Sequence, residues 1–233
     1  MRQLKNLLNF IFFVLAFLVI DVELSFSQEY KYEYGLMGGT ASYLGDVNKT
    51  NLFKNPSLSG GFVFRHNLSF RWAMKYNLVA GSVYGNSNNS NNHLPFDKEY
   101  SFSRTFFDLS AQVEFNFLPY SDKYSYSGTK PYTPYVFTGL GLTYAMGGDD
   151  FFNINAPFGV GFKYKLKNRV NIGLEFSLRK LFVDDFEVVD SSETYTLDSP
   201  YGIESSRLKN QDWYSLTLLF LTWEFGLRKD PCR

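Results

Sequence analysis

The chain has few side chains that could carry out acid–base or nucleophilic chemistry. It contains two histidines, His66 and His93, and one cysteine, Cys232. A serine hydrolase needs a serine nucleophile, a histidine base and an acidic residue that orients the histidine. His66 falls in a predicted tight turn and His93 in an asparagine-rich connection, and neither is accompanied by a suitably presented serine on a strand. Because two histidines and one cysteine also make no metal set, we expect no enzymatic activity, no cofactor and no metal.

Two pairs of adjacent aspartates, Asp149-Asp150 and Asp184-Asp185, remain as candidates for ligand binding. Both pairs fall in polar connections, where carboxylates could bind a divalent cation or the ions that bridge lipopolysaccharide. The alternative is that they are solvated loop charges, as most exposed acids are. Charged residues at strand positions also allow two interpretations: a proton or ion path, or the ion pairs that fill a narrow barrel, which we favour.

The elements that carry these residues are segments of alternating polarity. Every second residue from Phe107 to Phe117 is apolar, and the residues between them are Asp, Ser, Gln, Glu and Asn. Such alternation predicts strands with one polar and one apolar face. We expect eight strands, at residues 32–43, 58–65, 70–78, 107–117, 135–144, 158–166, 170–179 and 213–225. In the last one the alternation slips near Leu219-Phe220, which we interpret as a β-bulge.

The two faces of these strands differ sharply. One carries aromatic and aliphatic side chains, and the other carries the charged residues Arg71, Lys75, Asp108, Glu114, Lys163, Lys165, Glu175, Arg179 and Glu224, with Gly139 and Gly141. A soluble sandwich or a lipocalin-like barrel would turn the apolar face inward. A bacterial outer-membrane barrel, with an even number of strands, turns it outward to lipid, and we favour that fold. Eight strands leave room only for side chains, so we predict a lumen filled by paired charges, and no pore.

The first residues support export. Arg2 and Lys5 precede an apolar run that ends at Ile20, and the small residues at 25 and 27 fit a signal-peptidase site. The run is short for a transmembrane helix, which needs about 20 residues. We therefore expect a signal peptide at 1–27, a barrel at 28–226 and a short periplasmic tail at 227–233.

The connections alternate in length. Those at 45–57, 85–103, 147–156 and 184–210 are long, whereas those at 66–68 and 167–169 are tight. Outer loops are long and periplasmic turns short, which predicts that both termini are periplasmic. The connection at 119–131 is long for a periplasmic turn. It could contact a partner, or it could be a passive insertion, since extra loop length costs little entropy.

The candidate contact residues at this end are aromatic, basic or, in one case, a thiol. They are Tyr120, Lys123, Tyr124, Tyr126 and Lys130 in the connection, and Arg228, Lys229 and Cys232 in the tail. The thiol of Cys232 could remain free or pair with another chain in an oxidising periplasm. The formal net charge of zero argues against a nucleic-acid partner. An aromatic content of 19% fits the girdles of a barrel among outer-membrane lipids.

Several segments resemble a known family. They are the run GGTASYLGDV at 38–47, Phe115-Asn116-Phe117, the run PYVFTGLG at 134–141, the run NQDWYS at 210–215, and Phe225-Gly226 followed by a basic tail with a cysteine. In this order they are similar to the PorG-type outer-membrane proteins of the type IX secretion system of Bacteroidetes. The run Leu218-Leu219-Phe220-Leu221 is more apolar than that pattern.

The resemblance implies a non-enzymatic protein without a small-molecule substrate. It implies that the barrel anchors the periplasmic ring of the secretion machinery, built from a lipoprotein and its partner, to the outer membrane. The alternative is a generic small outer-membrane barrel that stabilises the membrane or adheres through its outer loops.

Overall fold

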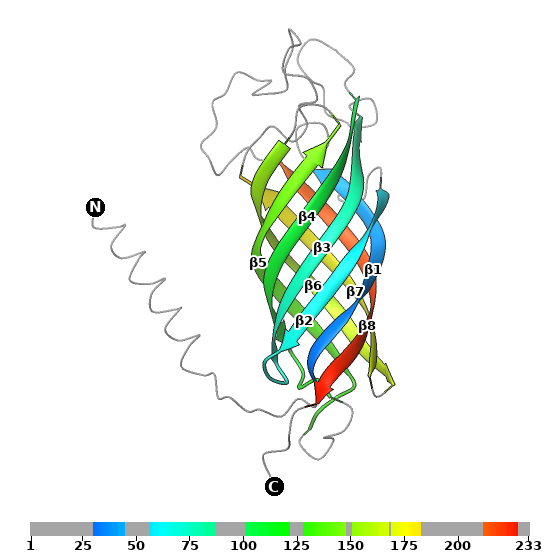
Figure 1. Ribbon diagram of the computed structural model, residues 1–233, viewed down its shortest axis with the longest axis vertical. Helices are drawn as coiled ribbons and strands as arrows, with labels where there is room; N and C mark the ends of the chain where they lie inside the picture. Colours follow the sequence, from blue (N-terminus) through cyan, green and yellow to red (C-terminus); the bar gives the residue numbers. More distant parts are fainter. Residues whose placement is uncertain are drawn as a thin grey trace, which may run out of the picture.

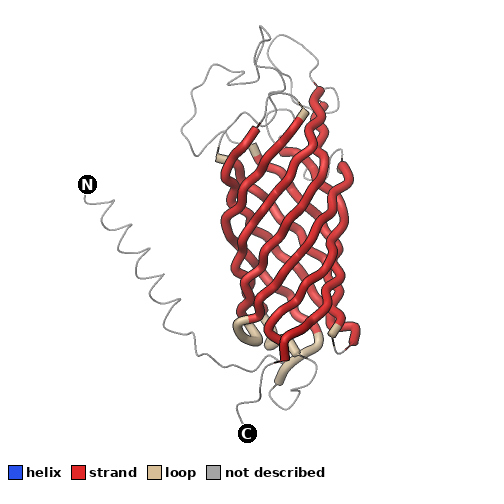
Figure 2. The backbone as a smooth tube through the Cα atoms, viewed as in Figure 1, coloured by secondary structure: helices blue, strands red, loops and turns tan. Residues whose placement is uncertain are grey.

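The computed structural model describes residues 30–44, 56–86, 101–121, 128–147, 151–167, 169–182 and 212–227. These residues form eight strands: β1 (Tyr30–Leu44), β2 (Ser57–Asn67), β3 (Trp72–Asn86), β4 (Ser101–Asn116), β5 (Tyr132–Met146), β6 (Phe151–Lys167), β7 (Val170–Leu181) and β8 (Trp213–Leu227). Each strand is antiparallel to the next, and β8 pairs with β1 to close a barrel (Figure 1). No helix in the described part is long and apolar enough to cross a membrane. Figure 2 shows that strands account for nearly all of the described backbone.

The barrel is apolar outside and charged inside, as the alternation predicts. Leu140 on β5 is 66% exposed and Leu36 on β1 is 60% exposed, whereas Glu114 and Lys163 are completely buried. Gly139 and Gly141 share the inward face of β5, at the alternate positions that follow Tyr135 and Phe137. This distribution of side chains is the reverse of that in a soluble β-barrel. Closing the sheet also gives the backbone N–H and C=O groups of every strand a neighbouring strand to bond with. The eight-stranded transmembrane barrel predicted from the sequence is therefore confirmed.

The first strand begins and the last strand ends at the same rim of the barrel. Tyr30, the first described residue, pairs with Leu227, the last. The short β2–β3 and β6–β7 turns lie at this rim too, as Figure 1 shows at the lower end of the barrel. We call this rim the periplasmic end, following the orientation that the loop lengths predict, and the opposite rim the outer end.

The strands extend further toward the outer end than the sequence suggested. β3 continues to Asn86 and β4 already begins at Ser101. β6 begins at Phe151 and pairs with β5 as far as Ala145, so the fifth connection is short and spans only 147–150. The prediction of a long connection at 147–156 was wrong, because Phe152 and Ile154 continue the outward face of the strand.

The predicted bulge in the last strand is absent. β8 keeps one register with β1 and with β7 along its whole length. Leu218 and Phe220 point inward and are buried, while Leu219 and Leu221 point outward and are exposed. The run that seemed to slip has large apolar side chains on both faces, because the lumen has an apolar layer at this height. The register shift that does occur lies in β6, between Lys165 and Lys167.

Two further assignments need correction at the periplasmic end. His66 is not a turn residue: it is in β2, pairs with Tyr32 and stacks its ring on that tyrosine at 5.0 Å between centroids. Arg71 does not line the lumen. It lies in the turn before β3, is exposed, and donates a hydrogen bond to the carbonyl of Phe117 at 2.8 Å. Pairing with β3 carries β2 to Asn67, which lies opposite Ala73, so the turn occupies 68–71.

Candidate functional site: the filled lumen and the periplasmic mouth

The interior holds equal numbers of acidic and basic side chains. All six acidic residues in the described part are buried, and so are six basic ones. The acids are Glu33, Asp108, Glu114, Glu175, Asp212 and Glu224, and the bases are Arg65, Lys75, Arg104, Lys163, Lys165 and Arg179. Buried charges are tolerated when they are paired and hydrogen-bonded. The balance predicts a neutral interior with no excess of either sign that would select an ion.

Glu114 on β4 is the centre of the largest cluster. Its Oε2 lies 3.0 Å from Nε of Arg65 on β2, and its Oε1 accepts a hydrogen bond from Lys163 on β6. Arg65 also reaches Glu33 on β1, at 3.2 Å. Asn67 donates to the other oxygen of Glu33 at 3.0 Å. One connected network thus ties together four strands that are not all neighbours in the sheet.

Two more ion pairs complete this periplasmic half of the lumen. Lys75 on β3 lies 2.6 Å from Glu175 on β7, and the hydroxyl of Tyr135 donates to the same carboxylate oxygen at 2.9 Å. Lys165 lies 2.8 Å from Glu224 on β8. Because these pairs cross the interior, the side chains that fill the lumen also brace the barrel.

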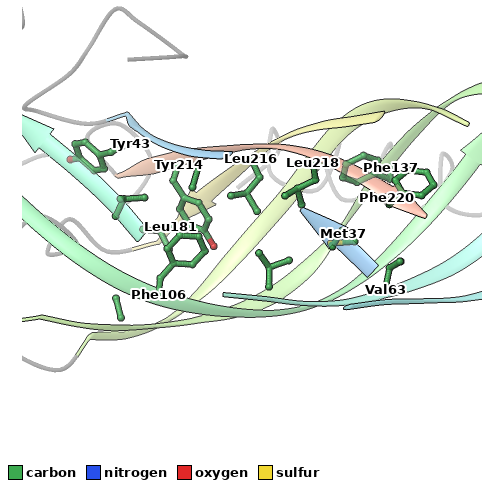
Figure 3. Packing of buried hydrophobic residues seen from close by; sticks show 14 of the residues in the cluster. Met37, Tyr43, Val63, Phe106, Phe137, Leu181, Tyr214, Leu216, Leu218 and Phe220 are labelled. Atoms are coloured by element: carbon green, nitrogen blue, oxygen red, sulfur yellow. The ribbon is translucent and has the colours of Figure 1, made fainter. Parts of the chain in front are cut away.

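An apolar layer lies above this network, toward the outer end. Figure 3 shows Met37, Val63, Phe137, Leu218 and Phe220 gathered inside the barrel wall. The cations below face aromatic rings of this layer. The guanidinium of Arg65 lies 4.4 Å from the Phe220 ring centre, and the ammonium of Lys75 lies 3.7 Å from that of Phe137. Such cation–π contacts are stronger where water is excluded.

A second polar cluster occupies the outer half of the lumen. Asp108 on β4 lies 3.2 Å from Nε of Arg179 on β7. The hydroxyl of Tyr214 donates to Asp108 at 2.7 Å, and the amide of Asn155 donates to the same oxygen at 2.7 Å. The apolar cluster continues into this half, where the rings of Phe106 and Tyr214 lie 5.1 Å apart between centres. Among the described residues, each polar cluster contains charges of both signs.

Tyr120 closes the periplasmic mouth. It belongs to the fourth connection, yet its side chain is completely buried, and its hydroxyl donates to Asn171 on β7 at 2.6 Å. The ammonium groups of Lys163 and Lys165 lie 4.9 and 5.4 Å from its ring centre. Burial, reinforced by nearby Glu33 and Glu224, raises the pKa of this phenol well above its ordinary value. The hydroxyl therefore stays protonated and remains a donor.

The backbone on both sides of Tyr120 is held in place. Tyr120 donates its N–H to the carbonyl of Phe70 in the β2–β3 turn at 3.2 Å. Lys130 donates to the carbonyl of Pro119 at 2.8 Å, and Ser121 donates to the carbonyl of Lys130 at 3.0 Å. The two flanks of the connection thus run side by side beneath the mouth.

The predicted contact residues fall into three groups. Lys130 is exposed at the periplasmic end, as a contact surface requires, whereas Tyr120 is buried and cannot be part of an exposed surface. The others lie outside the described residues: Lys123, Tyr124, Tyr126, Arg228, Lys229 and Cys232. The predicted signal peptide, His93 and both aspartate pairs also lie outside them. Among the described residues, no group of three or more His, Cys, Asp or Glu could hold a metal.

The role of Tyr120 and Tyr135 in the lumen was not foreseen. Tyr135 has the same strand parity as Gly139 and Gly141, which marked it as inward. Opposite it, a β-carbon on Gly161 would lie 2.3 Å from the Tyr135 ring. A glycine in one strand opposite a large aromatic residue in the next therefore indicates that the aromatic ring lies over the glycine inside the barrel. Tyr120 had no such signal, because it lies in a connection without alternation.

Comparison with known proteins places the chain in a family. A family model described as "Domain of unknown function (DUF6089)" matches residues 6–233. The chain belongs to this DUF6089 family. No curated protein sequence matches this DUF6089 member.

Solved structures resemble the DUF6089 barrel in fold. Neisserial surface protein A is 11% identical, with a TM-score of 0.51, and the match covers 85% of this chain and 100% of that one. The outer membrane protein OprG from Pseudomonas aeruginosa is 10% identical, with a TM-score of 0.43 over 85% of this chain and 98% of that one. Ail of Yersinia pestis, in complex with the heparin analogue sucrose octasulfate, is 9% identical, with a TM-score of 0.43 over 84% and 98%. These neighbours are outer-membrane β-barrel proteins, and at such identities the likeness concerns the fold alone.

Proposed function

We propose that this protein is a non-enzymatic outer-membrane anchor whose periplasmic end holds a multi-protein assembly. The observation that carries the proposal is the filled, charge-balanced lumen with Tyr120 seated in its periplasmic mouth. A barrel filled in this way offers no path for solute. Its useful surfaces are therefore its two ends and its lipid-facing wall.

The outer wall suits a lipid bilayer. Large apolar side chains are exposed on every strand, among them Leu58, Leu109, Phe152 and Leu174. Aromatic rings gather near the periplasmic rim, where Tyr32 stacks with Phe64 and lies against Phe225. Further toward the outer end, Phe158 meets Trp213 edge-on. Bands of this kind lie at the two interfaces of outer-membrane barrels.

The periplasmic end is the better candidate for partner binding. Residues 122–127 are inserted between Ser121 and Gly128, whose flanking backbone is bonded across the connection. This insertion starts and ends beneath the closed mouth, with Lys130 exposed beside it. A turn that only reversed the chain would need fewer residues. The hydrogen-bonded flanks fix both ends of this insertion at the periplasmic end.

The partner we propose is the periplasmic ring of a type IX secretion machinery, built from a lipoprotein and its partner. The support for this partner is the resemblance of the glycine- and aromatic-rich segments at 38–47, 115–117, 134–141 and 210–215 to PorG-type proteins. In this role the barrel carries no catalytic residue and transports nothing itself.

The test is to replace residues 122–127 with a Gly–Asn pair, which shortens the insertion but keeps Tyr120, Ser121 and Lys130 in place. Barrel assembly is scored by heat-modifiable migration, and binding by cross-linking and pull-down from native membranes. We expect normal assembly, loss of the cross-linked periplasmic proteins and loss of secretion. A matched control replaces residues 88–93, six residues of the third connection, with the same pair.

The opposite pattern would refute the anchor. If the 122–127 variant keeps its cross-links and secretion while the 88–93 variant loses function, the active surface is the outer end. The protein would then be a small barrel that acts through its outer loops.

A further inference from the structure

We infer that the periplasmic end of this barrel carries a ring of cations that binds anionic phospholipid headgroups in the surrounding leaflet. The starting observation is that acidic and basic side chains differ in their exposure. In the described ranges every acidic side chain is buried, whereas four basic side chains at the periplasmic end are exposed: Lys31, Arg71, Lys130 and Arg169. The outside of this end is therefore purely cationic over the residues that the structure describes.

The four cations are distributed around the whole rim. Lys31 lies at the start of β1, Arg71 in the β2–β3 turn, Lys130 between β4 and β5, and Arg169 in the β6–β7 turn. Since the strands are in chain order around the barrel, one cation follows every second strand. We name these four residues the cation ring. A protein docking on one side of the barrel needs a one-sided cluster, whereas lipids surround the barrel on all sides.

The two arginines are held at the rim by the protein. Arg71 donates to the carbonyl of Phe117 at 2.8 Å through one terminal nitrogen. Arg169 donates from Nε to the hydroxyl of Tyr30 at 3.1 Å and lies 5.3 Å from the centre of that ring. A guanidinium has five N–H donors, so each keeps donors for a phosphate, which it can bind in bidentate fashion. The side chains are thus positioned before any lipid binds.

The ring lies at the depth where headgroups are expected. Aromatic side chains, which favour the interface between lipid and water, flank it on the outer wall. Tyr32 follows Lys31, and Trp72 follows Arg71 and contacts Phe115 at 4.8 Å between ring centres. Long basic side chains at this level can keep their stems in the apolar zone and place the charge among phosphates. This inference holds whether or not the barrel anchors a secretion ring.

The experiment uses the full chain purified from outer membranes in detergent. Native mass spectrometry counts retained lipid after titration with phosphatidylglycerol or with phosphatidylethanolamine of the same acyl chains, at low and high salt. Each cation near an anionic surface contributes about a fivefold change in affinity. We expect the wild-type protein to prefer phosphatidylglycerol and to lose that preference as salt rises.

Three variants distinguish binding by the cation ring from a general effect of removing positive charge. The quadruple variant Lys31→Gln, Arg71→Gln, Lys130→Gln and Arg169→Gln should lose the preference. The double variant Lys31→Gln and Lys130→Gln keeps both arginine hydrogen bonds, and should show a partial loss of about 25-fold. Lys180→Gln, which removes a cation nearer the outer end, should leave the preference unchanged.

Equal retention of both lipids by the wild-type protein would overturn the inference. So would an unchanged preference in a heat-modifiable, and therefore folded, double variant. If the variants keep their lipids but release an acidic periplasmic protein, the cation ring is a protein-binding surface and the lipid assignment is wrong.

Discussion

The ammonium nitrogen of Lys75 lies 2.6 Å from a carboxylate oxygen of Glu175, across the interior of the barrel. Lys75 is on β3 and Glu175 on β7, with three strands between them in either direction around the ring. Both side chains are almost completely buried. The pair therefore links opposite walls through a region without bulk water.

Removing one charge of this pair should destabilise the barrel strongly. Glu175→Gln preserves shape but leaves the ammonium of Lys75 buried without its counter-ion, which costs about 3–5 kcal/mol of unfolding free energy. The double variant Lys75→Met and Glu175→Gln removes both charges and should recover most of the loss. Urea unfolding followed by tryptophan fluorescence measures both. Additive losses in the double variant would show that the two charges do not depend on each other.

The contribution of the buried Tyr120 side chain to stability can be tested by truncating it. Tyr120→Phe removes the hydrogen bond to Asn171 and should cost about 1 kcal/mol, whereas Tyr120→Ala leaves a cavity at the mouth and should cost about 3–5 kcal/mol. Tyr132→Ala is the control, because that ring is on the outer wall and 39% exposed. Equal stability of the two alanine variants in urea unfolding would contradict the buried position of Tyr120.

The intact protein should not conduct ions. Its described lumen is occupied by paired charges and by the apolar layer that includes Phe137, Leu218 and Phe220. Eight strands leave no water-filled passage once such side chains are in place. Planar bilayer recordings of the purified protein should show no stable channel, and a reproducible current of porin size would disprove the filled lumen.

A charge on the outer wall should cost more in the middle of the barrel than at its rim. Leu174→Arg places a cation near the centre of the lipid-facing wall, where the cost is about 2–4 kcal/mol. Leu227→Arg places it at the periplasmic end, where the cost is about 0–1 kcal/mol. Folding into vesicles at graded urea concentrations measures both. Equal costs would argue against a bilayer around this wall.

Two glycines with opposite surroundings test the packing of the lumen. A β-carbon at Gly161 would lie 2.3 Å from the ring of Tyr135, so Gly161→Ala must displace that ring from Glu175 and should cost about 1–3 kcal/mol. A β-carbon at Gly38 meets no atom within 4 Å, so Gly38→Ala should be neutral or slightly stabilising. The same unfolding assay compares them, and a neutral Gly161→Ala would mean that Tyr135 is not held as described.

Local backbone geometry let the sequence determine the strands and their faces. Successive side chains in a strand point to opposite sides, so alternation from Phe107 to Phe117 was enough to place Asp108 and Glu114 together on the inward face of β4. The same rule placed Lys163 and Lys165 on the inward face of β6. Eight alternating segments, an even number, then predicted a closed barrel.

Only the tertiary structure decided which inward residues meet. Lys75 and Glu175 are 100 positions apart, and their contact depends on the stagger of all the strands between them, which no local pattern records. Leu218 and Phe220 broke the expected alternation because the closed lumen has an apolar layer at their height. Tyr120 shows the same limit, since a residue in a connection has no strand parity and is placed by the cavity that it fills.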